Sequence, residues 1–354
     1  MLAGTAAAQA VEMAIANATA FERAELLELA RDFARRELAP RVVALDAGDL
    51  DAIGGCWLQI AELGLDRALL TEEHGGAGLE VVDFLAVIDE LAAGDGGIAL
   101  CVLLSNAALA AVGAETRTSI PGGARWVLVP GAREVETDGA GSPLAGGLTG
   151  VLGAYGADGV VLLGDAPAAI PADAAGLTCV RDETQMGLRG APMADLAIDG
   201  VAARSIPPAS GPPVVRDSVT LLRAGMAAIA RGIARGAYEM ALQYARERYQ
   251  GGVPIIRHDA VSDMLAAMAV RVTPPLPATT DERQALAAKV ALTEAAVATS
   301  TDAVQVFGGT GYMRETGIEK LMRDAMYCTQ FPESNWAARD QLIQDERRPA
   351  HTSR

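Results

Sequence analysis

The strongest constraint on the fold is an apolar stripe between residues 222 and 244. Its members recur at spacings of three and four residues: Leu222, Met226, Ile229, Ile233, Ala237, Met240 and Tyr244. That period places them on one face of a long α-helix. Similar stripes begin at Val261 and at Leu286. Because such helices bury their apolar faces against one another, the pattern predicts a C-terminal four-helix bundle over residues 214–346.

Two other regions precede this bundle. Residues 1–115 are predicted to form an α-helical domain. Its amphipathic helix from Phe21 to Leu38 is ended or kinked by Ala39-Pro40, and its helix from Ile98 to Val112 is strongly apolar. Glycine and proline become more frequent after Gly113, and short β-like runs appear at 125–129, 159–163, 177–180 and 194–198. They predict a small antiparallel β domain over 116–207. Prolines 207, 208, 212 and 213 form the predicted linker to the bundle, so the fold class is mainly α with a β middle domain.

Composition and charge exclude several classes of function. The chain has 354 residues and a net charge of −16, with no basic stripe, which argues against a nucleic-acid partner. The charge also provides no general attraction for an anionic cofactor, so any phosphate site must be local. Cys56, Cys101, Cys179 and Cys328 are far apart in the sequence and are expected to be reduced, mostly buried thiols. The first twenty or so residues lack a basic signal-peptide start, and no long uncharged apolar run occurs, so a soluble, cytoplasmic protein without a membrane partner or a metal is expected.

One stretch carries the most specific motif. Gln305 is followed by Gly308-Gly309, Gly311 and Tyr312, and then by Arg323-Asp324-Ala325. Glycines at these positions let the backbone approach a ligand or another chain closely. Glu319 and Arg323 are four residues apart, a spacing that pairs charges along a helix. The stretch resembles the C-terminal domain of flavin-dependent acyl-CoA dehydrogenases, where a Gln-x-x-Gly-Gly-x-Gly-Tyr loop precedes an Arg-Asp-Ala helix.

Three other segments resemble the same family in the same order. They are Glu37-Leu-Ala-Pro40 with the Gly-rich loop 72–78, the segment Gly187 to Val201, and Glu247-Arg-Tyr-Gln-Gly-Gly-Val-Pro-Ile255. The resemblance implies FAD as cofactor. It also implies that Arg248 and Gln250 contact the FAD pyrophosphate of a neighbouring subunit, and that Gln305, Gly308 and Gly309 approach the adenine–ribitol side. The alternatives from local structure are that Arg248 neutralises a helix dipole and that the glycines cap a helix.

The family resemblance also implies a catalytic carboxylate. The base that removes the substrate α-proton usually follows the Arg-Asp-Ala helix, and Glu333 is the carboxylate in that region, one residue later than the usual spacing. Alternatively, Glu333 is the N-terminal residue of the next helix, stabilised by its dipole. Some relatives place the base on the helix before Arg248, but Leu222 occupies the corresponding position. Arg223 next to it faces the active site or, as an ordinary arginine, the helix surface.

The middle region departs from the family pattern. The usual Thr-Glu-Pro-x-x-Gly-Ser-Asp loop and Trp-Ile-Thr segment, which hold the flavin ring, have no counterpart between Gly113 and Gly150, and Gly251 replaces the Phe of the Arg-x-Gln-Phe-Gly motif. The predicted function is FAD-dependent α,β-dehydrogenation of an acyl-CoA to the trans-2-enoyl-CoA. The alternatives are a non-catalytic or half-site subunit of a heteromeric complex, and a family enzyme with altered chemistry on a CoA thioester.

The resemblance also implies partners. They are the acyl-CoA substrate, an electron-transfer flavoprotein or similar acceptor, and further subunits in a homotetramer or homodimer, with a heteromer as the alternative.

Overall fold

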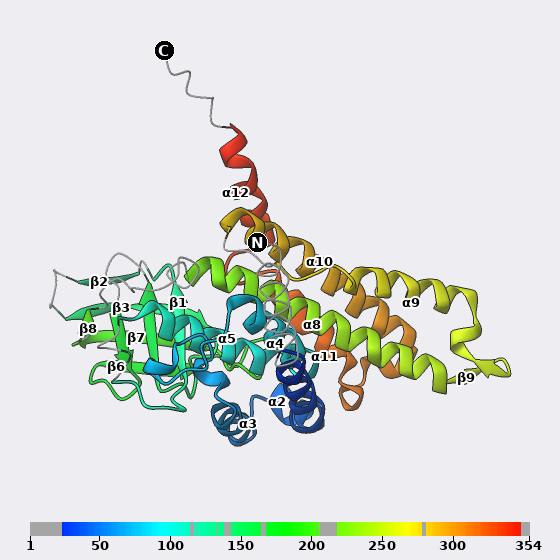
Figure 1. Ribbon diagram of the computed structural model, residues 1–354, viewed down its shortest axis with the longest axis horizontal. Helices are drawn as coiled ribbons and strands as arrows, with labels where there is room; N and C mark the ends of the chain where they lie inside the picture. The colour runs from blue at the N-terminus through cyan, green and yellow to red at the C-terminus, as the bar shows by residue number, and fades with distance from the viewer. Residues whose placement is uncertain are drawn as a thin grey trace, which may run out of the picture.

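The computed structural model has the expected succession of helical, β and helical parts. It describes residues 23–113, 117, 119–132, 134–137, 143–163, 168–202, 204–205, 218–277 and 281–347. Strands β1 to β8 lie at one end of the molecule, and the rest is helical apart from a short hairpin at the other end (Figure 1). The predicted fold class is therefore confirmed. The exact domain boundaries stay a prediction, and the first twenty residues and the linker prolines lie outside the described residues.

The N-terminal part is a chain of helices whose first member changes character at Pro40. Residues 23–33 are α-helical, and the helix continues through a π turn, η1 (Ala34–Leu38), and a 3₁₀ turn, η2 (Ala39–Arg41), into α2 (Val42–Asp46). Proline has no N–H for the helical ladder, so the hydrogen-bond pattern shifts where it enters. The segments that follow are α3 (Leu50–Glu62), η3 (Leu65–Arg67), η4 (Glu72–His74), α4 (Val81–Gly94) and α5 (Gly96–Ala111).

Helix α5 is the centre of the molecule. All its residues from Gly96 to Ala110 are buried, as the continuous apolar sequence predicts. Its N-terminus is capped by Asp95, whose carboxylate accepts the Ile98 N–H at 2.8 Å. Helix α5 packs against α4, β1 and α8, so one helix contacts all three parts of the chain.

The middle part contains two four-stranded sheets with the strand orders β1-β4-β5-β8 and β2-β3-β7-β6. The strands are β1 (Trp126–Pro130), β2 (Val135–Thr137), β3 (Leu144–Val151), β4 (Gly159–Leu163), β5 (Ala168–Pro171), β6 (Leu177–Arg181), β7 (Ala194–Val201) and β8 (Arg204–Ser205). The pairs are antiparallel except β1 with β4, which is parallel. The chain leaves β1, forms β2 and β3 in the other sheet, and returns as β4 in the same direction.

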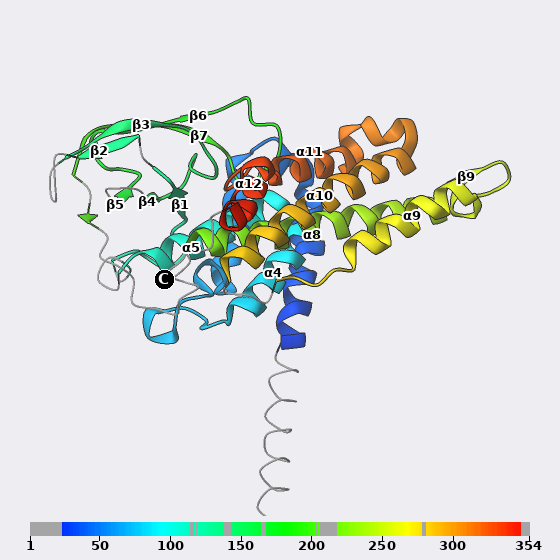
Figure 2. The same cartoon turned by 90° about the horizontal axis from the view of Figure 1, so that it is seen from above.

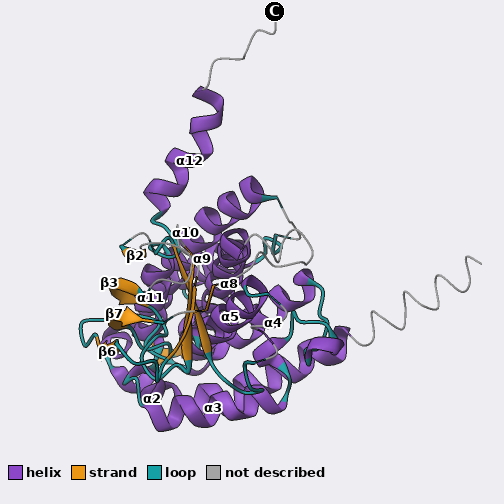
Figure 3. Cartoon of the chain, turned by 90° about the vertical axis from the view of Figure 1, so that its left-hand side faces the viewer, coloured by secondary structure: helices purple, strands orange, loops and turns teal. Residues whose placement is uncertain are grey.

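The C-terminal part is the predicted bundle. It contains α8 (Ser218–Glu247), α9 (Asp259–Val272), α10 (Glu282–Phe307) and α11 (Ile318–Cys328), followed by α12 (Asn335–Arg347), which projects from the body (Figure 1). Helix α8 packs against α10 and also against α4 and α5. The stripe seen in the sequence is thus covered from two sides. Seen from the β end, the strands lie in front of the bundle helices (Figure 3).

The short connections of the bundle form its far end. A hairpin of β9 (Tyr249–Gln250) and β10 (Val253–Pro254), followed by η5 (Ile255–Arg257), joins α8 to α9. Gly251 and Gly252 both have positive φ, +63° and +86°, as a tight two-residue hairpin turn requires. The segments η6 (Gly308–Tyr312) and η7 (Arg314–Thr316) join α10 to α11. Two perpendicular views place the β9–β10 hairpin at the end farthest from the sheets (Figures 1 and 2).

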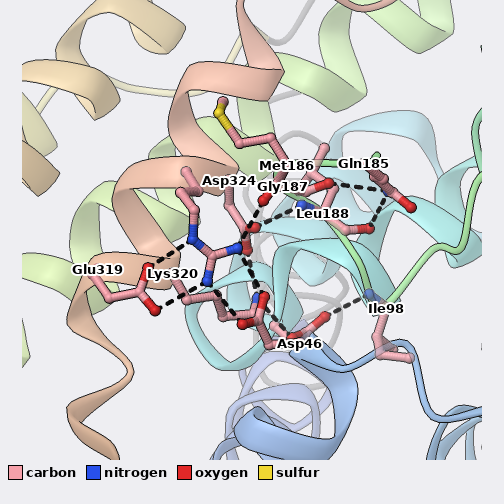
Figure 4. A network of polar contacts seen from close by, with 11 residues as sticks. Asp46, Ile98, Gln185, Met186, Gly187, Leu188, Glu319, Lys320 and Asp324 are labelled. Carbon is pink, nitrogen blue, oxygen red and sulfur yellow. Dashed lines mark hydrogen bonds and ion pairs between the residues drawn. The ribbon is translucent and has the colours of Figure 1, made fainter. Parts of the chain in front are cut away.

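A buried ionic network ties the three parts together (Figure 4). Lys320 Nζ lies 2.8 Å from Asp95 Oδ2 and 2.5 Å from Asp324 Oδ2, and all three side chains are buried. Asp324 also accepts the Leu188 N–H of the middle part at 2.6 Å. Burial alone would lower the pKa of Lys320, but the two carboxylates outweigh it and hold the pKa above its usual range. One lysine therefore links α5, the loop before β7 and α11.

Beside this network, the predicted Glu319–Arg323 pair forms along α11. Arg323 Nε lies 2.6 Å from Glu319 Oε2, and the same guanidinium also holds Asp46 at 2.8 Å through Nη2. Arg323 further donates to the Met186 carbonyl at 2.7 Å. These contacts join α11 to the end of α2 and to the middle part.

Candidate functional site

Glu333, the predicted base, lies in the loop between α11 and α12 and contacts the start of α8. Both its carboxylate oxygens accept from Arg223 Nε at 3.3 Å. Arg223 also binds Glu282 of α10 through Nη1 at 2.7 Å and Gln341 of α12 through Nη2 at 2.8 Å. The guanidinium thus joins four parts of the bundle around the candidate base.

The placement of Arg223 on the helix surface was wrong. Arg223 is only 5% exposed, because α10 packs against this part of α8 and Gln341 of α12 covers the guanidinium. A buried arginine requires carboxylate or other acceptors, and Glu282 and Glu333 supply them from distant positions in the chain. The structure therefore supports the other expectation, that Arg223 faces the candidate catalytic loop.

A buried lysine fixes the backbone of the same loop. Lys289 Nζ donates to the carbonyls of Glu333 at 2.6 Å and Thr329 at 3.2 Å, and to Asn335 Oδ1 at 2.8 Å. Burial lowers the pKa of Lys289 to about 8, although the negative charge of Glu333 acts in the opposite direction. Lys289 thus orients the backbone on both sides of Glu333, whereas Arg223 orients its carboxylate.

The ion pair constrains what Glu333 can do. Its side chain is 21% exposed, so solvent and small molecules can reach it. As a general base it must take a proton from a carbon, and a substrate would compete with Arg223 for the carboxylate. The alternative expectation, that Glu333 is the N-terminal residue of the next helix, was wrong, because α12 begins two residues later, at Asn335.

A crevice lies beside this loop. It has a volume of about 270 Å³ and is lined by the end of β1 (128–132), by residues 147–152 and by Phe331-Pro332 directly before Glu333. Among the described residues that line it, Glu134 and Thr149 have polar side chains and none is an arginine or lysine. The crevice has room for a small group, but its described lining offers no cation for a pyrophosphate.

The predicted cofactor-binding residues lie together at the other end of the bundle. Arg248, Gln250, Gln305, Gly308 and Gly309 are all exposed. Their two loops are held side by side by the ring of Tyr244, which stacks on Phe307 with centroids 4.2 Å apart. Within the described ranges, the Arg248 side chain has no hydrogen-bond or ion-pair partner. This end therefore presents a free cation and open backbone.

Gly308 and Gly309 of this loop differ in whether the conformation of the chain itself requires a glycine. Gly308 caps α10 with φ +62°, and its N–H bonds to the Gln305 carbonyl, so the predicted capping role is present. Gly309 has no positive φ, and a Cβ there would have nothing within 4 Å. Nothing in the described chain demands glycine at 309. Its backbone is open to whatever covers this surface.

Glu333 and the cofactor-binding candidates do not meet within one chain. Arg223, which holds Glu333, lies near the start of α8, and Arg248 directly follows its end. At a rise of about 1.5 Å per residue, the two arginines are roughly 37 Å apart along the helix. The predicted site residues thus form two groups at opposite ends of α8.

Most of the network around Glu333 was not predicted from the sequence. Glu282, Lys289, Asn335 and Gln341 were not predicted to share a site. One signal was available, because Lys289 interrupts the apolar stripe that Leu286 and Val290 define on α10. A lysine on the buried face of a helix needs acceptors there, and in this protein the loop carbonyls provide them.

Other features of the described residues bear on function. Cys56, Cys101 and Cys328 are buried free thiols, as predicted, whereas Cys179 is exposed. The described residues contain no cluster of side chains suited to a metal ion. Among them, no helix has the length and apolar character needed to cross a membrane.

Comparisons with known proteins identify the family. The acyl-CoA dehydrogenase N-terminal domain matches residues 21–116, and the acyl-CoA dehydrogenase C-terminal domain matches residues 209–274 and 276–331. The chain belongs to the acyl-CoA dehydrogenase family, so the predicted family is confirmed, and with it the enzyme class, oxidoreductases that act on CH–CH groups.

Individual relatives cover most of the chain. A cyclohex-1-ene-1-carbonyl-CoA dehydrogenase of Syntrophus aciditrophicus is 28% identical over 86% of this chain and 84% of its own length. A 3-sulfinopropanoyl-CoA desulfinase of Paraburkholderia xenovorans is 33% identical over 44% of this chain and 45% of its own. A glutaryl-CoA dehydrogenase from Mycobacterium smegmatis, solved in complex with FADH2, superposes with a TM-score of 0.81 at 17% identity, over 94% of this chain and 96% of that one. This last likeness establishes the fold alone.

Proposed function

We propose that this protein is a FAD-dependent acyl-CoA dehydrogenase in which Glu333 is the base. The observation that carries the proposal is the loop at 329–335, which puts Glu333 directly after the Phe331-Pro332 wall of the crevice. In the reaction, Glu333 accepts the α-proton of the thioester, and a β-hydride leaves with its electron pair. The α,β bond becomes a trans double bond. Bound FAD would supply the acceptor for the hydride, and an electron-transfer flavoprotein or similar acceptor would take the electrons onward.

The residues fit a flavin dinucleotide when two chains combine. The crevice has room for part of a cofactor, and its described lining contains no cation, whereas Arg248 is a free cation about one α8 length away. We propose that Arg248 and Gln250 hold the pyrophosphate of a neighbouring subunit's FAD, and that Gln305, Gly308 and Gly309 approach its adenine–ribitol side. Exposed Tyr249, Val270 and Tyr312, at 63%, 72% and 74%, lie on the same bundle and support its burial in an assembly. A homodimer or homotetramer in the cytoplasm is the expected form.

One observation favours a second function, a half-site subunit that serves a partner's FAD. The crevice offers few polar side chains to hold a flavin ring, and Arg223 occupies the carboxylate of Glu333. The Arg248 end, by contrast, retains every predicted residue in an exposed position. In that case this chain supplies Arg248 and Gln305 to a heteromer. Similarity to a desulfinase over part of the chain keeps altered thioester chemistry as a narrower alternative.

The absorption spectrum of the protein purified alone separates these functions. A yellow protein with about one FAD per chain, bleached by an acyl-CoA, is the result that the dehydrogenase proposal requires. A colourless protein that acquires FAD only with a co-expressed dehydrogenase-like chain supports the half-site function instead. A yellow protein that acyl-CoA does not bleach, yet that converts a substituted CoA thioester, supports the altered chemistry.

A further inference from the structure

A second cavity lies between α3 and the loops around β1 and β4. Its volume is about 360 Å³, and it shares no lining residue with the crevice next to Glu333. One wall is a face of α3 that carries Leu50, Ile53, Trp57 and Leu58. Leu50 and Leu58 are 39% and 65% exposed, although both are large apolar residues. The cavity is thus of ligand size, apolar and open.

The opposite side of this cavity contains an arginine without a counter-ion. Arg125 is only 4% exposed. Its guanidinium donates to the carbonyls of Gly153 at 3.4 Å and Tyr155 at 3.1 Å and contacts Cys101 Sγ at 3.3 Å. Within the described ranges no carboxylate pairs with the guanidinium. Burying an unpaired charge is costly, so this group calls for an explanation.

The nearby ionisable groups do not supply the missing charge. The carboxylate of Asp158 accepts the backbone N–H of Arg125 at 2.7 Å rather than a guanidinium N–H. Burial raises the pKa of the Cys101 thiol, so that group stays neutral. The remaining contacts of the guanidinium are neutral carbonyls, so it has no counter-ion among the described residues.

Two other arginines of this chain show how a guanidinium binds a carboxylate. Arg31 donates hydrogen bonds to the carboxylate of Glu90 through Nε and Nη2, and Arg231 donates to Asp89 in the same way. In Arg125 the bonds to neighbours use Nη1 and one Nη2 hydrogen, so Nε–H and a second Nη2–H remain without an acceptor in the described chain. A Cβ added at Gly156, which lines the cavity, would lie 3.3 Å from Nη2. The open donors therefore belong to a guanidinium that borders the cavity.

Helix α3 has open space beside two of its residues, and one of them lines the cavity. It contains two adjacent glycines, Gly54 and Gly55, and a Cβ at either would meet nothing within 4 Å. Glycine inside a helix is less stable than alanine by roughly 0.5–1 kcal/mol. Gly54 lines the cavity and Gly55 does not. A side chain at 54 would extend into the cavity, and one at 55 would not.

We propose that this cavity binds a small organic monocarboxylate, whose carboxylate pairs with Arg125 and whose apolar body packs between Leu50, Trp57 and Leu58. A guanidinium with free N–H groups can donate charge-assisted hydrogen bonds to a carboxylate. Asp158 also lines the cavity and repels anions, so a single negative charge suits the cavity better than a phosphate dianion. The site is independent of the proposed dehydrogenase reaction.

The test is a ¹⁹F NMR titration of the full-length protein with 4-fluorobenzoate, using 4-fluorobenzyl alcohol as the uncharged probe. Saturable binding of the acid is expected, with the alcohol about tenfold weaker or worse because it cannot replace the charge-assisted bonds. Arg125→Lys keeps the charge but loses the guanidinium N–H donors and should also weaken binding about tenfold. Circular dichroism and the unfolding midpoint check that this variant folds.

The decisive comparison is Gly54→Leu with Gly55→Leu. Both replace a glycine of the same helix with the same side chain, so their effects on α3 should match. Gly54→Leu should abolish binding of the acid, and Gly55→Leu should leave it unchanged. Equal affinity in the two variants would place the probe elsewhere, the Glu333 crevice included, and would overturn the proposal. Absence of saturable binding, or equal affinity for acid and alcohol, would overturn it as well.

Discussion

The two ends of helix α8 differ in how their charges are satisfied. At its start, Arg223 has partners on α10, α12 and the Glu333 loop, all within one chain. At its end, Arg248 is exposed without a partner in the described residues, and Tyr249 next to it is 63% exposed. The first end is complete in a single chain, whereas the second has the character of a surface that another molecule completes. Changes at the first end should therefore alter chemistry and stability, and changes at the second should alter binding.

Glu333→Gln should have the largest effect. If Glu333 removes the α-proton, the rate of flavin reduction by acyl-CoA should fall by about 10²–10⁴-fold with FAD content unchanged. Stopped-flow absorbance of the flavin measures this rate. Glu282→Gln is the matched control, because it removes the other carboxylate on Arg223. If the control loses as much activity as Glu333→Gln, Glu333 acts through Arg223 and is not the base.

The pH dependence of stability should report on Lys289. Its pKa is about 8 in the folded protein, against 10.5 as the ordinary value. Between these values the unfolded chain holds a proton that the folded chain has lost, so stability rises with pH. The free energy of unfolding should therefore increase by about 3 kcal/mol from pH 8 to 10.5, relative to Lys289→Met. Urea titrations at several pH values measure the difference. A constant difference between the two proteins would contradict the lowered pKa.

Removing Arg223 should destabilise the packing around the start of helix α8. Arg223→Leu leaves Glu333 and Glu282 without their cation, and because both are partly exposed, at 21% and 54%, we expect a loss of about 2–3 kcal/mol in the free energy of unfolding. Chemical denaturation gives the value. In the double variant Arg223→Leu/Glu333→Gln, part of the loss should be recovered, since one unpaired charge is gone. Strict additivity of the two changes would show that the pair has no coupling.

Arg248→Ala should have the smallest effect on the chain and a specific effect on its cofactor. We expect FAD affinity to fall about tenfold or more through loss of a pyrophosphate contact, with the unfolding midpoint of the apoprotein unchanged. Equilibrium dialysis measures FAD retention. Arg246→Ala is the matched control, an exposed arginine two residues away. Similar losses in both variants would indicate a general charge effect and would remove Arg248 from the proposed site.

Much of the architecture could be predicted from local patterns. The spacing of apolar residues and the positions of glycine and proline located the helices, because an apolar face repeats every three or four residues in any buried helix. The four predicted strands are present as β1, β4, β6 and β7. Strand β3 was missed because its sequence, Leu144 to Val151, contains three glycines and little β-branched character. Gly146 is required there by a neighbour in space, since a Cβ would lie 2.2 Å from the Glu134 carbonyl oxygen.

The residues of the candidate site also fall into two groups, those that local sequence patterns located and those that only the fold brought together. The sequence by itself determined the family, the helical period and the positions of Glu333, Arg248 and the glycine loop, because motifs and periods are local. Only the tertiary structure decided that Arg223 is buried against Glu333, that Lys289 holds the loop backbone and that Arg248 lies at the far end of the same helix. The reason is physical. A buried charge is satisfied by groups that are neighbours in space, and chain folding brings those groups from positions 40 to 110 residues away.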